Sequence, residues 1–148
     1  MRLASKRFLV WYRALPVAVL LVFGLISSVY TYAPALVFKP FYPIKYESYI
    51  KASSVRHGLD PYLVCAVIKA ESNWEPTAQS NQGAQGLMQL LPETAQDMIA
   101  QGEVNGSSYS SQNLSDPETN IEFGCAYLSY LLKYFNGSTD RAIAAYNA

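Results

Sequence analysis

The first part of this chain lacks acidic side chains altogether. No Asp or Glu precedes Glu47, whereas Arg and Lys recur there, and acids outnumber bases in the rest, so that the net formal charge is +0. Binding to a nucleic acid relies on a basic surface patch. The distribution of charge therefore argues against a nucleic-acid partner.

Cysteine and histidine, the common ligands of structural metal ions, are also scarce. Cys65 and Cys125 are the only cysteines, and their spacing matches no metal-site pattern, so we predict no metal ion. They are either two small buried side chains or a disulfide between two helices, and the sequence leaves both open. The single histidine, His57, precedes Gly58 at a predicted helix end, where we expect it to bond to carbonyl groups rather than to act in catalysis.

No strand-length run of alternating apolar and polar residues is present. Helix ends are marked instead: Asp60-Pro61 and Asp116-Pro117 each place a capping side chain before a first-turn proline, and Pro92 opens another helix. Predicted helices run over residues 46–57, from 61 to about 72, from 92 to about 101, from 117 to about 135 and from 139 to 146. The sequence predicts an all-α domain, with at most a very short hairpin near residues 86–90.

One long apolar run, residues 14–38, carries no charge. About 20 apolar residues suffice for a membrane-spanning helix. Basic residues precede the run, and the positive-inside rule places residues 1–13 in the cytoplasm. We predict a signal anchor at 14–38, a stiff linker at 39–45 and an extracytoplasmic domain at 46–148, so that the chain crosses the cell membrane once. A cleaved signal peptide is the alternative.

A single acid stands at the end of a predicted apolar helix. Leu63, Val64, Val67 and Ile68 recur with helical spacing, and Glu71 follows on the last turn. The chain then enters a loop rich in glycines, amides and hydroxyls. Such an arrangement builds a polar cleft around one carboxyl group. It indicates general acid–base chemistry on a neutral, hydrogen-bonding substrate, with a sugar as the first candidate.

A general acid must hold its proton near neutral pH, and apolar surroundings raise the pKa of a carboxyl group. We expect Val67, Ile68, Met88 and Leu90 to supply such surroundings for Glu71.

Three blocks of sequence, taken in order, carry a family resemblance. The first holds Glu71-Ser72, Gly86-Leu87-Met88-Gln89-Leu90 and Thr94-Ala95, the second holds Asn120-Ile121, Gly124 and Tyr127-Leu128, and the third is Ala-Ile-Ala-Ala-Tyr-Asn-Ala at residues 142–148. Together they resemble the soluble lytic transglycosylase domain family, over about residue 46 to the end. The resemblance implies a goose-type-lysozyme-like fold and cleavage of bacterial peptidoglycan.

The resemblance also implies roles for single residues. Glu71 takes the place of the family's one catalytic acid. Ser80, Gln89 and Thr94 match positions that line the cleft and contact the glycan or its peptide, and Tyr146 matches the tyrosine that approaches the catalytic carboxyl group. Residue chemistry alone also allows a simpler role for each of the last four. Ser80 can form a turn, Gln89 can be a polar loop residue, Thr94 can be a first-turn helix residue and Tyr146 can be a core tyrosine.

Most glycosidases use two carboxylates across the scissile bond. Here only Glu71 matches a catalytic acid, since Glu75 lies just before Pro76 in the loop and is expected to be solvated. The resemblance implies a substrate-assisted route, in which Glu71 first protonates the glycosidic oxygen between N-acetylmuramic acid and N-acetylglucosamine. It then acts as base on the C6 hydroxyl of the muramoyl sugar, which closes a 1,6-anhydro ring. The route needs no metal ion and no cofactor.

Two other functions stay open. The first is a muramidase on the same fold, in which water attacks. The second is a non-catalytic protein that binds the wall or serves as a scaffold. The predicted partners of the chain are peptidoglycan glycan strands and the membrane.

The chain ends at Ala148. The family pattern continues there with a glycine and at least one more helix. The resemblance therefore predicts that the catalytic domain is C-terminally incomplete.

Overall fold

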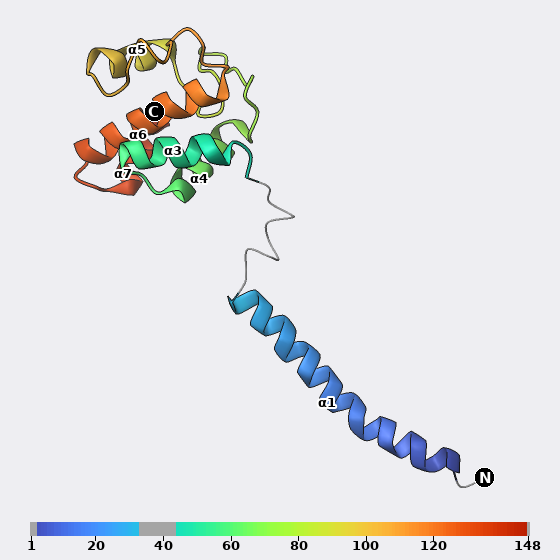
Figure 1. Cartoon of the computed structure of the whole chain (residues 1–148). Coiled ribbons are helices and arrows are strands. Elements are labelled where there is room, and N and C mark those ends of the chain that lie inside the picture. Colours follow the sequence, from blue (N-terminus) through green and yellow to red (C-terminus); the bar gives the residue numbers. More distant parts are fainter. Residues whose placement is uncertain (1–2, 33–43, 148) are drawn as a thin grey trace. The chain divides into compact units, whose positions relative to one another are not determined.

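The computed structural model describes residues 3–32 and 44–147. Its helices are α1 (Leu3–Tyr32), α3 (Glu47–His57), α4 (Pro61–Ser72), α5 (Pro92–Ala100), α6 (Pro117–Tyr134) and α7 (Thr139–Tyr146) (Figure 1). Over these two ranges no strand forms, and isolated antiparallel bridges join Gln79 to Gln85 and Gln85 to Leu90. The predicted all-α fold is confirmed, and the hairpin expected near residues 86–90 amounts to these bridges.

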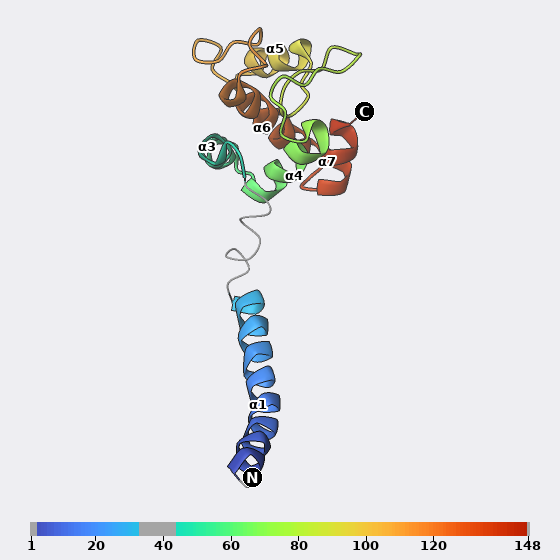
Figure 2. The same cartoon turned by 90° about the vertical axis from the view of Figure 1, so that its right-hand side faces the viewer.

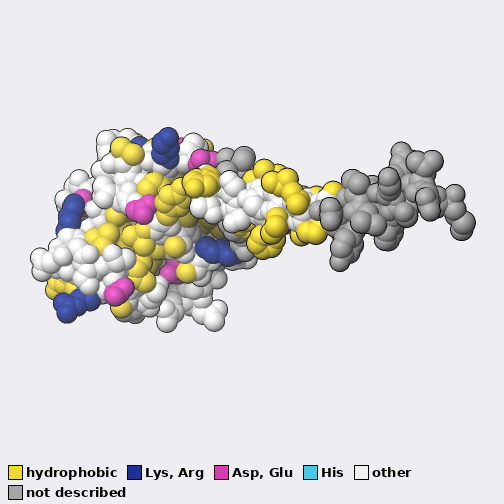
Figure 3. All heavy atoms as spheres, turned by 90° about the horizontal axis from the view of Figure 1, so that it is seen from below, with side chains coloured by type: hydrophobic (Ala, Val, Ile, Leu, Met, Phe, Trp, Pro, Cys, Tyr) yellow, Lys and Arg dark blue, Asp and Glu magenta, His cyan; other side chains and the backbone are white. Residues whose placement is uncertain are grey.

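The chain divides into two compact units, Met1–Ile44 and Lys45–Ala148. In the first unit, the stretch Ala14–Tyr32 of α1 has 19 residues, a mean hydropathy of 2.1 and no buried share. Figure 3 shows hydrophobic side chains along it. Its length and composition fit a membrane span and equally a signal sequence. The last part of the predicted anchor and most of the predicted linker lie outside the described residues.

The helix ends of the second unit follow local rules. The Asp60 carboxylate accepts a hydrogen bond of 2.9 Å from the Tyr62 amide, and that of Asp116 accepts one of 2.9 Å from the Thr119 amide. Each acid thus caps a helix whose first residue is proline. Ser138 occupies the capping position of α7 but makes no side-chain cap bond.

Helix α6 is central in the domain, where it packs against α3, α5 and α7 (Figure 2). Two hydrophobic clusters meet on it. The first joins side chains of α3, α4 and α6 to the loop before α5: Ile50, Val64, Val67, Ile68, Leu87, Met88, Ile121, Cys125 and Leu128. The second joins α5, α6 and their connection to the end of the loop before α5: Leu90, Ala95, Met98, Val104, Leu114, Phe123 and Ala126. The 73–91 loop is thereby fixed between both clusters.

Cys65 on α4 and Cys125 on α6 are free thiols. Cys125 belongs to the first cluster, and Cys65 packs against it. Burial raises the pKa of both thiols, which keeps them in the less reactive protonated form. In this structure they act as small apolar side chains rather than as a bridge.

Candidate active site

Glu71 lies on the last turn of α4, as the sequence predicts. The helix ends at Asn73, whose φ is 51°, and Trp74 follows with a φ of 69°. These two left-handed residues turn the chain sharply away from the helix axis. The Glu71 side chain is half-buried, and burial raises the pKa of its carboxyl group. A carboxyl group with a raised pKa keeps its proton closer to neutral pH, which suits a general acid.

The four residues expected to form apolar surroundings for this carboxyl group are buried. Val67, Ile68, Met88 and Leu90 are all buried, at 6%, 0%, 0% and 2% exposure. Val67 and Ile68 precede Glu71 by four and three positions, so that they share its side of α4. Met88 joins them in the first cluster, whereas Leu90 packs in the second.

Ser80 shapes the loop that follows Glu71. Its hydroxyl oxygen accepts hydrogen bonds from the amides of Gln82, at 3.2 Å, and Ala84, at 3.0 Å. Its backbone exchanges bonds with Gly83 and Ala84. The side chain is exposed and orders a tight turn.

Gln89 also fastens this loop. Its Nε2 donates to the carbonyl oxygens of Ala78, at 3.1 Å, and Gly86, at 2.9 Å. Because both partners are acceptors, the amide orientation is fixed, and Oε1 is the atom left over for another donor. Gln89 holds a φ of 45°, which is uncommon for a residue with a side chain and often accompanies function.

Thr94 is the third residue of α5 and is half-buried. Its hydroxyl makes no hydrogen bond with any described residue, so that it is available to a ligand.

Tyr146 ends α7 and reaches across to the loop. Its hydroxyl donates to the Met88 carbonyl oxygen at 2.8 Å, and its ring lies 5.2 Å from the Tyr127 ring. Burial raises the pKa of Tyr146 well above 10, and the nearby charge of Glu71 adds to this. Tyr146 is therefore neutral, and the charge of Glu71 acts on it.

Glu75, the other acid of this region, is exposed. Its Oε1 accepts from the Thr77 hydroxyl, at 2.6 Å, and from the Thr77 amide, at 3.2 Å. These bonds lower the pKa of Glu75. It is an ionised loop residue with no apolar surroundings, and only Glu71 has the environment of a general acid here.

One buried carboxyl group on α6 is not predicted by the sequence analysis. Glu122 on α6 is 4% exposed. It accepts hydrogen bonds from Ser53 and Arg56 of α3 and lies 3.0 Å from Nε2 of His57. Burial alone would raise its pKa, but the bonds from His57, Arg56 and Ser53 outweigh burial and lower the pKa to about 2. The signal available in the sequence was one acid within an apolar helical face.

The expectation for His57 is wrong. Its ring pairs with Glu122 rather than with helix carbonyl groups, because α6 brings a carboxylate to the end of α3. A pocket of about 420 Å³ opens beside this pair, and Glu71 does not line it. The pocket is thus separate from the predicted cleft.

Comparison with known proteins matches the larger unit. The family model described as "Transglycosylase SLT domain" matches residues 48–148. The soluble lytic murein transglycosylase of Escherichia coli K12 is 36% identical over 107 residues, which cover 72% of this chain and 16% of that protein. The membrane-bound lytic murein transglycosylase C of Photorhabdus laumondii is 36% identical over 110 residues, which cover 70% of this chain and 31% of that protein. The chain therefore spans less than a third of the length of either relative.

Solved structures agree with the sequence matches. An inactive Glu-to-Gln mutant of the lytic transglycosylase Slt from Pseudomonas aeruginosa superposes with a TM-score of 0.68 at 33% identity, covering 75% of this chain and 18% of that one. The 70 kDa soluble lytic transglycosylase of Escherichia coli gives a TM-score of 0.68 at 34% identity, covering 74% and 18%. The predicted lysozyme-like fold is confirmed.

Proposed function

Since this chain belongs to the transglycosylase SLT domain family, we propose that it is a peptidoglycan lytic transglycosylase. It cleaves the β-1,4 bond between N-acetylmuramic acid and N-acetylglucosamine without consuming water. Relatives called soluble and membrane-bound lytic murein transglycosylase support the activity. The observation that carries it is Glu71, a half-buried carboxyl group whose burial raises its pKa, at the start of a polar loop.

Glu71 acts first as acid and then as base. It gives its proton to the glycosidic oxygen as the bond to the muramoyl C1 breaks, and the sugar's N-acetyl group stabilises the positive charge that develops there. The Glu71 carboxylate then takes the proton of the C6 hydroxyl. The C6 oxygen of the sugar bonds to C1 and closes the 1,6-anhydro ring. The ionised, exposed Glu75 supports a route with one carboxyl group.

The other predicted residues bind the substrate. Gln89 has a free Oε1 and Thr94 a free hydroxyl, and both suit the hydroxyl and amide groups of a glycan strand. Ser80 holds the turn at the cleft edge and, being exposed, offers its own O–H as donor. Tyr146 stays neutral beside Glu71, where it orients the carboxyl group.

Replacing Glu71 tests this assignment. Glu71→Gln keeps the shape but removes the proton, so that release of muropeptides from purified sacculi should fall at least about 100-fold, the lower range of general-acid contributions. Thermal unfolding and sedimentation with sacculi should be unchanged. In one relative, a Glu-to-Gln mutant is described as inactive.

Glu75→Gln is the matched control, since it makes the same change four residues away on an exposed acid. Its activity should equal that of the unaltered chain. If neither the unaltered chain nor the Glu71→Gln protein releases muropeptides, the wall-binding or scaffold function is favoured instead.

The chain is anchored in the cell membrane by α1, with its N-terminus in the cytoplasm and residues 46–148 on the outer side. Basic residues before Ala14 and the apolar stretch Ala14–Tyr32 support this orientation. Residues 39–45 serve as the spacer that lets the domain reach the wall.

A further inference from the structure

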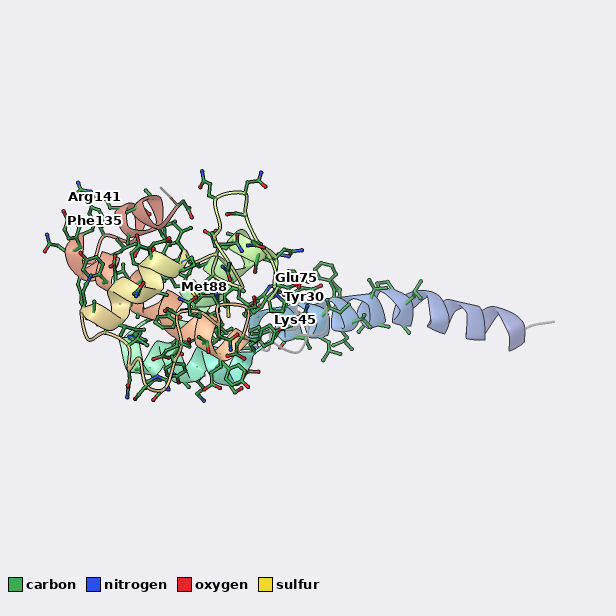
Figure 4. The ribbon with its side chains drawn as sticks, turned by 90° about the horizontal axis from the view of Figure 1, so that it is seen from above. Tyr30, Lys45, Glu75, Met88, Phe135 and Arg141 are labelled. Carbon is green, nitrogen blue, oxygen red and sulfur yellow. The ribbon has the colours of Figure 1, made fainter. Side chains whose placement is uncertain are left out.

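Met88 is held at three points by two helices that are distant in sequence. Its amide donates to the Asn120 Oδ1 on α6 at 2.7 Å, and its carbonyl oxygen accepts from the Tyr146 hydroxyl on α7 at 2.8 Å. Its side chain lies so close to Gly124 that a Cβ there would come within 2.3 Å of the sulfur. Asn120 and Gly124 are one turn apart on α6 and share one face. In Figure 4 Met88 lies inside the domain, whereas Phe135 and Arg141 lie at its end.

Asn120 uses both halves of its amide for this purpose. It is wholly buried, and its Nδ2 donates to the carbonyl oxygens of Gln85 and Leu114, both at 2.9 Å. The approach is so close that a Cβ on Gly86 would lie 2.2 Å from the Leu114 oxygen and 2.3 Å from the Asn120 nitrogen. A buried amide with this many partners fixes the turn that it contacts.

The turn carries the groups proposed for the reaction. Gln89, directly after Met88, keeps its positive φ only where the surroundings determine the backbone. Met88 itself shares a cluster with Val67 and Ile68, one turn before Glu71. Tyr146 connects the two sides, since its hydroxyl bonds to Met88 and the charge of Glu71 contributes to its raised pKa.

We propose that Asn120 is a positioning residue of the active site. Through Met88 it keeps the apolar wall closed against Glu71 and holds Gln89 in its strained conformation. Gly124 provides the space for this contact, and Tyr146 secures the opposite end of the same peptide. The catalytic consequence of this proposal rests on the proposed function. The effect of Asn120 on the turn can be measured by hydrogen exchange, without any activity.

Asn120→Ala in the full-length chain tests the hold by hydrogen exchange. The informative amides are Gly86 and Leu90, because their acceptors, the carbonyl oxygens of Ala78 and Gln85, remain in the variant. Their exchange should become at least about tenfold faster if Asn120 fixes the turn. Glu122→Gln is the matched control, since Glu122 is buried two residues further along α6 and turned by about 200° from Asn120. In that control, any faster exchange of the same amides should be fully explained by the loss of global stability.

Kinetics on soluble peptidoglycan fragments test the consequence. In Asn120→Ala we expect kcat to fall at least about tenfold with a smaller change in KM, because the reacting groups are misplaced rather than lost. The basic limb of the pH profile should shift to lower pH, since water that reaches Glu71 lowers its pKa. Tyr146, on which the charge of Glu71 acts, stays neutral in this pH range.

Two results would overturn the proposal: unchanged exchange at Gly86 and Leu90, or a shift in the pH profile of the Glu122→Gln control as large as in Asn120→Ala. If the Asn120→Ala chain does not fold, Tyr146→Phe removes the bond of the Tyr146 hydroxyl to Met88. It should speed the same two amides, a readout that needs no activity, and unchanged exchange there overturns the proposal as well. A lack of cleavage by the unaltered chain contradicts the proposed function instead, and the exchange comparison still decides whether Asn120 holds the turn.

Discussion

At the scale of single residues, two carboxyl groups of this domain have opposite electrostatic environments. Glu71 is half-buried, and burial raises its pKa, while Glu122 is buried among donors that lower its pKa to about 2. The first environment favours a group that carries a proton. The second favours a permanent charge that joins α3 to α6. A glutamate's position in a helix does not distinguish them, but its partners do.

Acid sensitivity of stability follows from Glu122. Its folded pKa of about 2 lies below the ordinary value of 4.5. The stabilisation of the folded state by Glu122 is therefore full above about pH 4.5 and is lost as the pH falls towards 2. It amounts to at most about 3 kcal/mol. Solvent screening at the half-exposed Arg56 reduces this value. Urea unfolding between pH 7 and 3 should show this loss in the unaltered chain and much less of it in Glu122→Gln.

Glu93→Gln is the control for that series, because Glu93 is exposed on α5. Its stability should depend on pH as the unaltered chain does. The same acid dependence in Glu122→Gln would show that the loss arises elsewhere.

At the scale of helices and loops, the sequence predicts the features that depend on residues adjacent in the chain. Asp60-Pro61 and Asp116-Pro117 begin helices because cap and first turn are adjacent in the chain, and both bonds are present. The catalytic candidate on α4 and the loop after it follow from the same local signals. The start of α7 differs, since Ser138 occupies the capping position without a side-chain cap bond.

Contacts between distant segments could not be predicted in this way. The bonds of Glu122 to α3 span more than 60 positions, and Asn120 meets Met88 across 32. Each depends on how α6 packs, which no local pattern states. The family resemblance marks Asn120 and Gly124 as pattern residues, but only the structure shows that they hold one peptide.

Two glycines of the loop before α5 should differ in the stability that is lost when alanine replaces them. Gly83 and Gly86 both have a positive φ, of 89° and 79°, but only at Gly86 would a Cβ meet other atoms. Alanine at Gly83 should cost about 1 to 2 kcal/mol for its backbone conformation. Alanine at Gly86 should cost at least about 2 kcal/mol more, because of the clash with Leu114 and Asn120. Urea unfolding of the two variants measures the difference, and equal losses would contradict the close packing of the turn on α6.

At the scale of the whole molecule, an apolar helix and a transglycosylase SLT domain occur in one chain. The order of the two units fits the proposed topology, in which the helix anchors the domain to the membrane. In that topology, the tether would limit cleavage to wall that lies near the membrane.

Fractionation tests this arrangement. The full-length chain should stay with membranes after alkaline extraction, and protease added to cells without a wall should digest residues 46–148 while the membrane helix remains. A mature protein that lacks the apolar segment and leaves the membrane would support a cleaved signal peptide.

The chemistry of the product tests the central claim most directly. Digestion of purified sacculi in ¹⁸O-labelled water, followed by mass spectrometry, identifies what attacks the muramoyl C1. If Glu71 acts as acid and then as base on the sugar's own hydroxyl, every new end is a 1,6-anhydro ring, one water lighter than a reducing end and free of the label. Reducing ends that carry ¹⁸O would show that water attacks, and the protein would be a muramidase.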